Sequence, residues 1–316
     1  MDLLLYGIMR VLLGVIRALP LRMVARLGRC AGTLAWWFDR RHRRVALKNL
    51  SMCFSQEMSR SEIRRLAREN FRRIGENFCC AAKTASMSAE ELRPHLEFTG
   101  DPSILSPPPG QTPPSAVVAI GHFGNFELYA RFGAFCSAYR CAATYRGLRQ
   151  PALNRLLLSL RERSGCRFFE RRTEAAALRQ ELNRPGLLLG LLADQHAGRR
   201  GLRLPFLGHD CSTSAAPAVL ALRYHCALHT AICYRVDLAR WRIEAGPAIP
   251  LYANGAARPL ADIMAEVNRR FEAAVRQDPA NWFWVHNRWK PDKPRRRRPR
   301  RGGLSGSPPQ QRQRSS

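Results

Sequence analysis

The run Ala116-Val117-Val118-Ala119-Ile120 consists of five consecutive apolar residues, three of them β-branched. A run this short and this apolar predicts a strand that is buried on both faces of a sheet. Further strands are expected at 166–169, 187–193, 230–236 and 241–245, and helices at 34–52, 60–84, 125–139, 151–164, 173–183, 214–227 and 260–277. Strands that alternate with helices indicate an α/β fold with a central, mostly parallel or mixed sheet flanked by helices. The six prolines of 101–115 predict a loop.

The chain of 316 residues carries 52 Lys+Arg against 24 Asp+Glu, a formal net charge of +28. Such a field attracts nucleic acid, anionic lipid surfaces or acidic proteins, and charge alone does not choose among them. Residues 291–316 are rich in Arg, Pro, Gly, Ser and Gln, which predicts a basic disordered tail. The tail could simply be solubilising, or it could attach the protein to an anionic membrane. Nucleic-acid binding is less favoured, because no zinc finger, RNP motif or clear helix-turn-helix accompanies it.

Residues 3–19 are apolar except for Arg10 and Arg17. As a helix they would span about 26 Å, just short of a hydrocarbon core, and Arg10 would lie near the middle. Together with Arg22 and Arg26, these arginines could form a basic stripe beside an apolar one, the pattern of a helix in the headgroup layer. A short tilted span and a buried core helix are the alternatives. The predicted organisation is a membrane-associating helix over 1–30, a domain over 31–290 and a tail over 291–316.

The segment Gly121-His-Phe-Gly-Asn-Phe-Glu127 directly follows the apolar strand and begins a predicted helix. Catalytic groups of open α/β sheets collect where strands end and helices begin. Asn125 suits a helix N-cap, which would place Glu127 in the first turn. Glu127 could then bind one imidazole nitrogen of His122 and leave the other free to take a proton from a hydroxyl. The alternative interpretation is a hydrogen-bonded structural histidine near a helix cap.

Several blocks of the chain resemble, in order, the bacterial lipid A biosynthesis acyltransferases, the late enzymes that add secondary acyl chains. GHFGNFE resembles their His-x4-Asp/Glu block, and the similarity covers roughly residues 1–292. Three positions depart from the common pattern, which puts the substrate in doubt rather than the reaction class: Phe126, Leu207 and Asn287. The other matching blocks are Tyr145-Arg146 with Asn154, Arg161 and Arg163 before Gly165; Leu192-Ala193-Asp194-Gln195; Pro205-Phe206-Leu207-Gly208 with Thr213, Pro217 and Ala218; Asp278-Pro279; and Trp282 to Lys290.

The resemblance implies a glycerolipid-acyltransferase-like fold and transfer of an acyl chain to a hydroxyl of a glycolipid, a lipid A precursor. The donor would be acyl-carrier protein or acyl-CoA, and the domain would face the cytoplasm at the inner membrane. His122 would be the general base and Glu127 its partner, with oxyanion donors from the backbone N–H groups of 123–125 or a nearby arginine. The residues expected to bind substrate are Asn125, Tyr145, Arg146, Arg161, Arg163, Asp194, Arg288 and Lys290.

Other residues that could carry chemistry are weaker candidates. No Ser or Cys lies within the His122 motif, so direct attack by the acceptor hydroxyl is favoured over an acyl-enzyme. The ten cysteines form no CxxC pair and are expected to be reduced. His225 and His229 lack a third ligand at recognisable spacing, so no metal or other cofactor is expected. The remaining alternatives are an acyltransferase acting on another membrane glycolipid, such as an inositol mannoside, and a non-catalytic basic protein that binds membrane surfaces.

Overall fold

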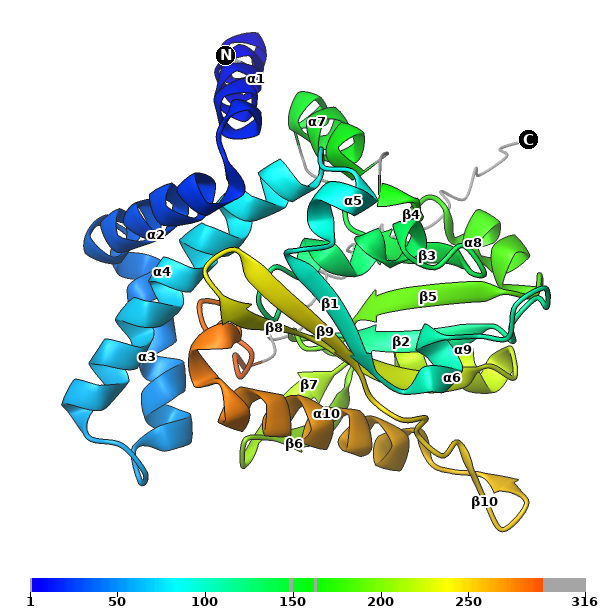
Figure 1. The fold of residues 1–316 in the computed structure, drawn as a ribbon. Helices are drawn as coiled ribbons and strands as arrows, with labels where there is room; N and C mark the ends of the chain where they lie inside the picture. The colour runs from blue at the N-terminus through cyan, green and yellow to red at the C-terminus, as the bar shows by residue number, and fades with distance from the viewer. Residues whose placement is uncertain (1, 148–149, 162–163, 292–316) are drawn as a thin grey trace, which may run out of the picture.

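The computed structural model describes residues 2–147, 150–161 and 164–291, and its centre is a seven-stranded sheet in the order β1-β9-β8-β2-β5-β3-β4 (Figure 1). All neighbouring strands are parallel except β8 and β9. The α/β class with a mostly parallel central sheet is therefore confirmed. The strands are β1 (Leu96–Gly100), β2 (Ala116–Ile120), β3 (Arg140–Tyr145), β4 (Cys166–Glu170), β5 (Leu187–Leu192), β8 (Ala227–Asp237) and β9 (Arg240–Ala245).

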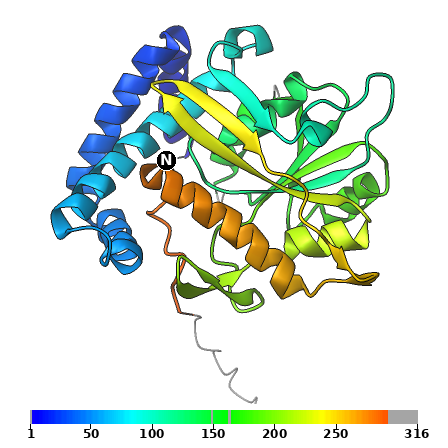
Figure 2. The same cartoon turned by 60° about the horizontal axis from the view of Figure 1, so that its bottom comes forward.

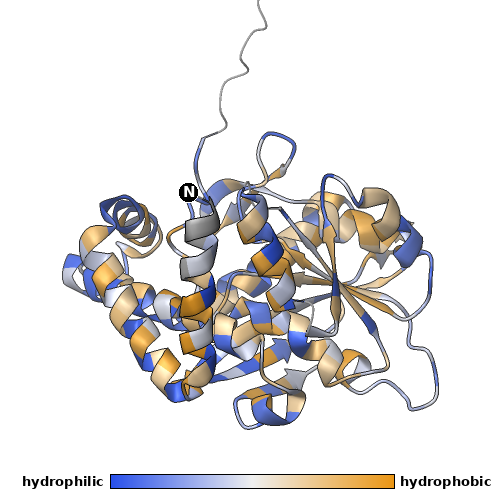
Figure 3. Ribbon diagram, turned by 90° about the horizontal axis from the view of Figure 1, so that it is seen from above, coloured by the Kyte–Doolittle hydropathy of each residue, from blue (hydrophilic) through white to orange (hydrophobic). Residues whose placement is uncertain are grey.

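Helices cover both faces of this sheet, and two short hairpins project from it (Figures 1 and 2). Figure 3 shows that the strands of the sheet are mainly hydrophobic, whereas the surrounding helices alternate between hydrophobic and hydrophilic residues. The helices are α1 (Asp2–Ala18), α2 (Leu21–Phe38), α3 (Arg40–Phe54), α4 (Arg60–Thr84), α5 (Ala89–Leu92), α6 (Pro102–Leu105), η1 (Phe126–Ala134), α7 (Pro151–Arg161), α8 (Ala175–Leu182), α9 (Ala216–Arg223), α10 (Leu260–Gln277) and η3 (Pro279–Asn281). The hairpins are β6 (Leu202–Phe206) with β7 (His209–Thr213), and β10 (Tyr252–Ala253) with β11 (Ala256–Ala257).

Strand β2 lies in the middle of the sheet and is buried along its whole length. Val117 and Ala119 pack into the core formed with α9 and α10, and Val118 and Ile120 pack into the core on the opposite face, with η1 and α6. Ile120 pairs with Leu192 of β5, so these parallel strands end at the same edge. The residues that follow each strand therefore meet there.

The N-terminal region differs from the single helix expected over 1–30. Two helices, α1 and α2, are separated at Leu19 and Pro20, where proline supplies no N–H for a continuing helix. Within the described part of the chain, no helix combines the length and the hydropathy needed to cross a bilayer. The expected helix 34–52 is likewise divided at Asp39, whose carboxylate accepts from the His42 N–H at 3.0 Å and caps α3.

Other boundaries also differ from the expectation. The segment expected as a helix over 125–139 contains the 3-10 helix η1. The helix expected over 214–227 ends at Arg223, and His229 lies in strand β8. Strands β1 and β3 and the β6–β7 hairpin were not predicted, and α6 lies within the predicted loop 101–115. The tail predicted over 291–316 lies, apart from Pro291, outside the described residues.

Helices α2 and α4 pack backbone against backbone through three glycines. A Cβ atom on Gly32 would lie 2.2 Å from the Phe71 carbonyl oxygen, and one on Gly28 would lie 2.5 Å from that of Gly75. Both distances are too short for any side chain, so the close packing of α2 on α4 requires glycine at these positions.

Gly32→Ala is expected to lower the free energy of unfolding by about 1–3 kcal/mol, because the methyl group overpacks the α2–α4 contact. The matched control is Gly14→Ala in α1, where a Cβ would meet no atom within 4 Å. This control should leave stability unchanged or raise it by about 0.5–1 kcal/mol. Urea unfolding followed by circular dichroism measures both, and equal stability of Gly32→Ala and the parent protein would contradict the packing.

Candidate active site

His122 lies in the turn after β2, and Asp194 lies in the turn after the neighbouring strand β5. The imidazole Nδ1 of His122 is 2.7 Å from Asp194 Oδ1, and its backbone N–H donates to Oδ2 at 2.8 Å. Trp282 Nε1 donates to the same Oδ2 at 2.9 Å. A carboxylate can only accept, so Nδ1 carries the proton and Nε2 keeps a lone pair that can accept a hydrogen bond or a proton. Asp194 therefore fixes both the tautomer and the direction of the imidazole ring.

The Asp194 carboxylate is buried, yet it is ionised. Burial alone raises its pKa, but the charge of His122, the hydrogen bonds from the ring and backbone of His122, and the bond from Trp282 outweigh burial and lower the pKa to about 2. An anion held in this way stabilises the imidazolium that forms when Nε2 takes up a proton.

Glu127 does not make the hydrogen bond to His122 that the sequence suggested. Its carboxylate instead accepts from Arg161 of α7, at 3.0 Å from Nε and 2.6 Å from Nη2. The Arg161 guanidinium also stacks over Phe168 and Tyr145, at 4.7 and 5.8 Å from the ring centroids. The Asp194 carboxylate, at the end of the adjacent strand β5, occupies the Nδ1 side of the imidazole. The hydrogen-bond partner of His122 is therefore Asp194, and the expected bond to Glu127 was wrong.

The backbone donors expected to form an oxyanion hole are largely engaged. The Phe123 N–H donates to the Gly121 carbonyl at 2.9 Å, and the Gly124 N–H donates to the Asn281 carbonyl at 3.0 Å. Gly124 has φ +50°, and a Cβ there would lie 2.6 Å from the Cys233 carbonyl oxygen, so glycine is required at this turn. Asn125 precedes η1 as expected, but its buried side chain makes no capping hydrogen bond.

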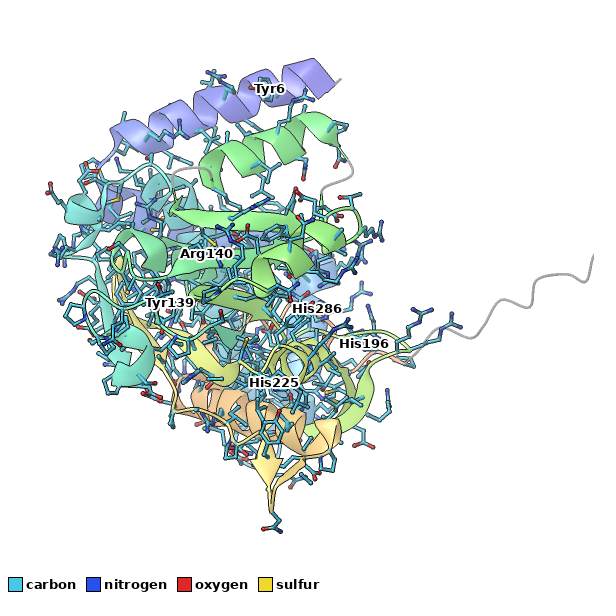
Figure 4. All side chains as sticks on the ribbon, turned by 90° about the vertical axis from the view of Figure 1, so that its right-hand side faces the viewer. Tyr6, Tyr139, Arg140, His196, His225 and His286 are labelled. Carbon is cyan, nitrogen blue, oxygen red and sulfur yellow. The ribbon has the colours of Figure 1, made fainter. Side chains whose placement is uncertain are left out.

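Two further residues that had no role in the sequence-based prediction line the same cleft as His122. Gln195 Nε2 lies 3.2 Å from His122 Nε2, and His286 Nε2 accepts from the His196 N–H at 3.2 Å. His196 and His286 are seen together in Figure 4. Desolvation lowers the pKa of His286 to about 4, with smaller contributions from the charges of Asp194, which opposes the shift, and of Lys290. The signal for both Gln195 and His286 was their place within the matching sequence blocks.

The His122 ring borders a cleft of about 810 Å³ whose lining includes Tyr145, Arg146, Gln195, His286 and Lys290. The cleft is large enough for a sugar-sized group and carries exposed cations on its wall. Of the residues expected to bind substrate, Tyr145, Arg146 and Lys290 are thus brought together with His122. Arg163 lies outside the described residues.

Arg288 does not reach this cleft, which corrects its expected contact with substrate. The side chain is fully buried, and its Nη1 donates to the carbonyls of Gln195 and Ser212 at 2.5 and 3.1 Å. Its Nη2 donates to Thr213 Oγ1 at 2.9 Å. Through its Nη1 bonds to these two backbone carbonyls, Arg288 supports the Gln195 loop from inside the protein.

The low pKa of His286 predicts that the folded protein loses stability in acid. The unfolded chain takes up this proton near pH 6.5, whereas the folded protein resists it down to about 4, so the free energy of unfolding should fall across this window as pH falls. His286→Asn should lose less stability between pH 7 and 4.5 than the parent protein, as measured by thermal unfolding. The control is His225→Asn at an exposed turn residue with φ +51°, a conformation that Asn tolerates. An unchanged acid response in His286→Asn would contradict the prediction.

Comparison with known proteins agrees with the resemblance found in the sequence. The family model for the bacterial lipid A biosynthesis acyltransferase matches residues 3–291. A lipid A biosynthesis palmitoleoyltransferase of Escherichia coli (strain K12) is 26% identical over 281 residues, which are 86% of each chain. A lipid A biosynthesis acyltransferase of Shigella flexneri shows the same identity and coverage. The match spans the whole sheet and both residues of the His122–Asp194 pair, and the chain therefore belongs to the bacterial lipid A biosynthesis acyltransferase family and is an acyltransferase.

Proposed function

We propose that this enzyme transfers a fatty acyl chain from acyl-carrier protein or acyl-CoA to a hydroxyl of a lipid A precursor, with His122 as general base. The observation that supports this most is the His122–Asp194 pair at the wall of a cleft that also bears exposed cations. The resemblance to lipid A biosynthesis acyltransferases supports the acceptor class.

The proposed reaction needs only one proton carrier. Nε2 of His122 takes the proton of the acceptor hydroxyl while the oxygen attacks the thioester carbonyl. The tetrahedral intermediate collapses, the carbon–sulfur bond breaks, and the thiolate leaves with the proton from Nε2. Asp194 stays ionised throughout and balances the imidazolium. The Gln195 amide, 3.2 Å from Nε2, occupies the place that the hydroxyl would take, so it has to yield on binding.

The acceptor's phosphate groups are proposed to bind Arg146 and Lys290. Both are exposed and line the cleft. The charge of Arg161, by contrast, is already neutralised by Glu127, at 2.6 Å. Arg146 is also the better phosphate ligand of the two arginines, because no carboxylate of the described residues shares its planar fork of donors.

The acyl chain is proposed to lie between α4 and α7. A cavity of about 210 Å³ there is lined mostly by apolar side chains, including Phe78, Ala81, Ala130 and Leu157, and Glu127 and Arg161 border it. We therefore assign the Glu127–Arg161 pair a positioning role, because it joins η1 to α7 beside His122 and holds this cavity in shape.

The enzyme is further proposed to lie on the anionic cytoplasmic face of the inner membrane through α1 and α2. Trp37 and Phe38 of α2 are 55% and 81% exposed, on the side opposite the glycines that pack on α4. Met23, Leu27 and Leu34 extend this stripe along the helix, and Arg22 and Arg26 flank it. An exposed apolar stripe with basic flanks is typical of helices in the headgroup layer.

The catalytic proposal predicts that His122→Gln lowers the transfer rate by about 10²–10⁴. Asp194→Asn should cause a loss of similar size, and the double variant should be no slower than His122→Gln, since the two residues act as a unit. Transfer of a labelled acyl chain to a lipid A precursor in detergent measures this, with exposed Asp210→Asn as the matched control. Near-full activity of Asp194→Asn beside a severe loss in Glu127→Gln would contradict the assignment of the pair.

The membrane proposal predicts that the double change Trp37→Ser and Phe38→Ser weakens binding to vesicles containing phosphatidylglycerol at least about tenfold, because two aromatic side chains no longer enter the bilayer. The control is Val219→Ser with Tyr252→Ser, two exposed apolar residues on other elements. Vesicle co-sedimentation measures both variants. An equal loss of binding in the control would show that α2 is not the contact.

A further inference from the structure

A small cavity adjoins His122, between α4, the turn after β2 and the segment 280–283. Its volume is about 20 Å³. Four asparagines from three distant parts of the chain line it, and their side chains are at least nine-tenths buried: Asn70, Asn77, Asn125 and Asn281. His122 and Glu127 also border the cavity, so it adjoins the site of the proposed chemistry.

These asparagines carry five buried polar atoms that, within the described residues, have no hydrogen-bond partner. They are Oδ1 of Asn70, Asn77 and Asn281, and both Oδ1 and Nδ2 of Asn125. A buried polar group left without a hydrogen bond destabilises the folded state, so five such atoms around one cavity require a partner.

The orientation of two of the amides is fixed by their other bonds. Asn70 Nδ2 donates to the carbonyls of Ala280 and Trp282 at 2.9 and 2.6 Å, and Asn281 Nδ2 donates to the Cys233 carbonyl at 2.9 Å. Because these partners can only accept, each nitrogen is assigned and the oxygen is the unpaired atom. A partner for the cavity must therefore donate hydrogen bonds, and it must also accept one from Asn125 Nδ2.

We infer that this cavity is a binding site for one or two ordered water molecules that position the His122 turn. A water needs about 10–15 Å³ and two to four polar partners, and the cavity supplies both. A water molecule donates two hydrogen bonds and accepts two. It can therefore donate to the unpaired asparagine oxygens and accept from Asn125 Nδ2. An anion has no donor for the four amide carbonyl oxygens, and a metal cation would be repelled by the Asn125 N–H group.

The bound water acts on the turn through Asn125. Asn125 lies midway between His122 and Glu127, and within the described residues neither its Oδ1 nor its Nδ2 has a direct hydrogen-bond partner. Water would link its amide to Asn70 and Asn77 of α4 and to Asn281, whose backbone carbonyl already accepts from Gly124. Asn77 and Asn125 are thus positioning residues. This kinetic role depends on the proposed function, whereas the water site does not.

The first experiment is a crystal structure of the full chain at a resolution that shows ordered water. Density for water within hydrogen-bond distance of Asn125 and at least one of the other three asparagines is expected. A dry cavity, a cation with short oxygen contacts, or side chains rotated to bond one another would overturn the inference.

The second experiment expels the water with Asn77→Leu, which fills the cavity with an apolar side chain. The expected result is a kcat at least about tenfold lower, since a small misplacement of the turn is costly, with KM within about twofold. Asn77→Ser keeps a polar group and leaves room for water, so it should restore most of the kcat. Asn183→Leu, on an exposed asparagine outside the cavity, is the matched control and should change neither constant.

An unchanged kcat in Asn77→Leu, with the water absent from its crystal structure, would overturn the positioning role. So would an equal loss in Asn77→Ser with the water still bound. If the parent protein transferred no acyl chain from either donor, the proposed function would fail, and the crystal structure alone would still decide the water site.

Discussion

The hydrogen bond between His122 and Asp194 depends on the register of two parallel strands. Ile120 and Leu192 are paired at the ends of β2 and β5, and each reactive side chain lies two residues beyond its strand. Parallel strands end at the same edge of a sheet, so no long loop is needed to bring an imidazole and a carboxylate from distant parts of the chain to 2.7 Å. A shift of one residue in this register would turn every side chain of β2 to the other face and separate the pair.

The C-terminal segment holds this edge of the sheet in place, although little of it has regular structure. Trp282 donates to Asp194, and Arg288 donates to the Gln195 carbonyl beside it. The carbonyl groups of the segment are in turn bound by asparagine side chains: Asn49 of α3 donates to Trp284 and His286, and Asn70 of α4 donates to Ala280 and Trp282. Irregular backbone in a buried place needs such partners, which explains why these polar residues lie inside the protein.

Much of the fold followed from local sequence patterns. The β-branched run of β2, the helical spacing in α4 and the alternation of elements predicted the sheet and its class. Strand β3 was missed because Arg140-Cys-Ala-Ala-Thr-Tyr145 is neither a β-branched apolar run nor a strict alternation, although β4 and β5 pair with it on its two sides. The boundary between α2 and α3 was missed because it depends on a single local interaction, the hydrogen bond from the His42 N–H to the Asp39 carboxylate that caps α3.

The sequence predicted that His122 lies at the centre of the site, but it did not predict which carboxylate is hydrogen-bonded to His122. His122 followed from its position after a strand, and Asp194 was placed at the site as a substrate contact. The sequence separation of five residues favoured Glu127 as the partner, whereas the actual partner is 72 residues away and adjacent only through the β2–β5 pairing. Likewise, Arg288 could be taken for a phosphate ligand because nothing local to the sequence shows that its guanidinium is buried among backbone carbonyls.

The central claim is that the His122 Nδ1 carries a proton, which it donates to Asp194, while the Nε2 lone pair faces Gln195 and the cleft. Nitrogen-15 NMR of histidine-labelled protein reports the two ring nitrogens separately, and His122→Gln assigns the signals. We expect a protonated Nδ1 and an unprotonated Nε2 near neutral pH, with this preference lost in Asp194→Asn. A proton on Nε2 in the parent protein, or a preference that Asp194→Asn leaves unchanged, would contradict it.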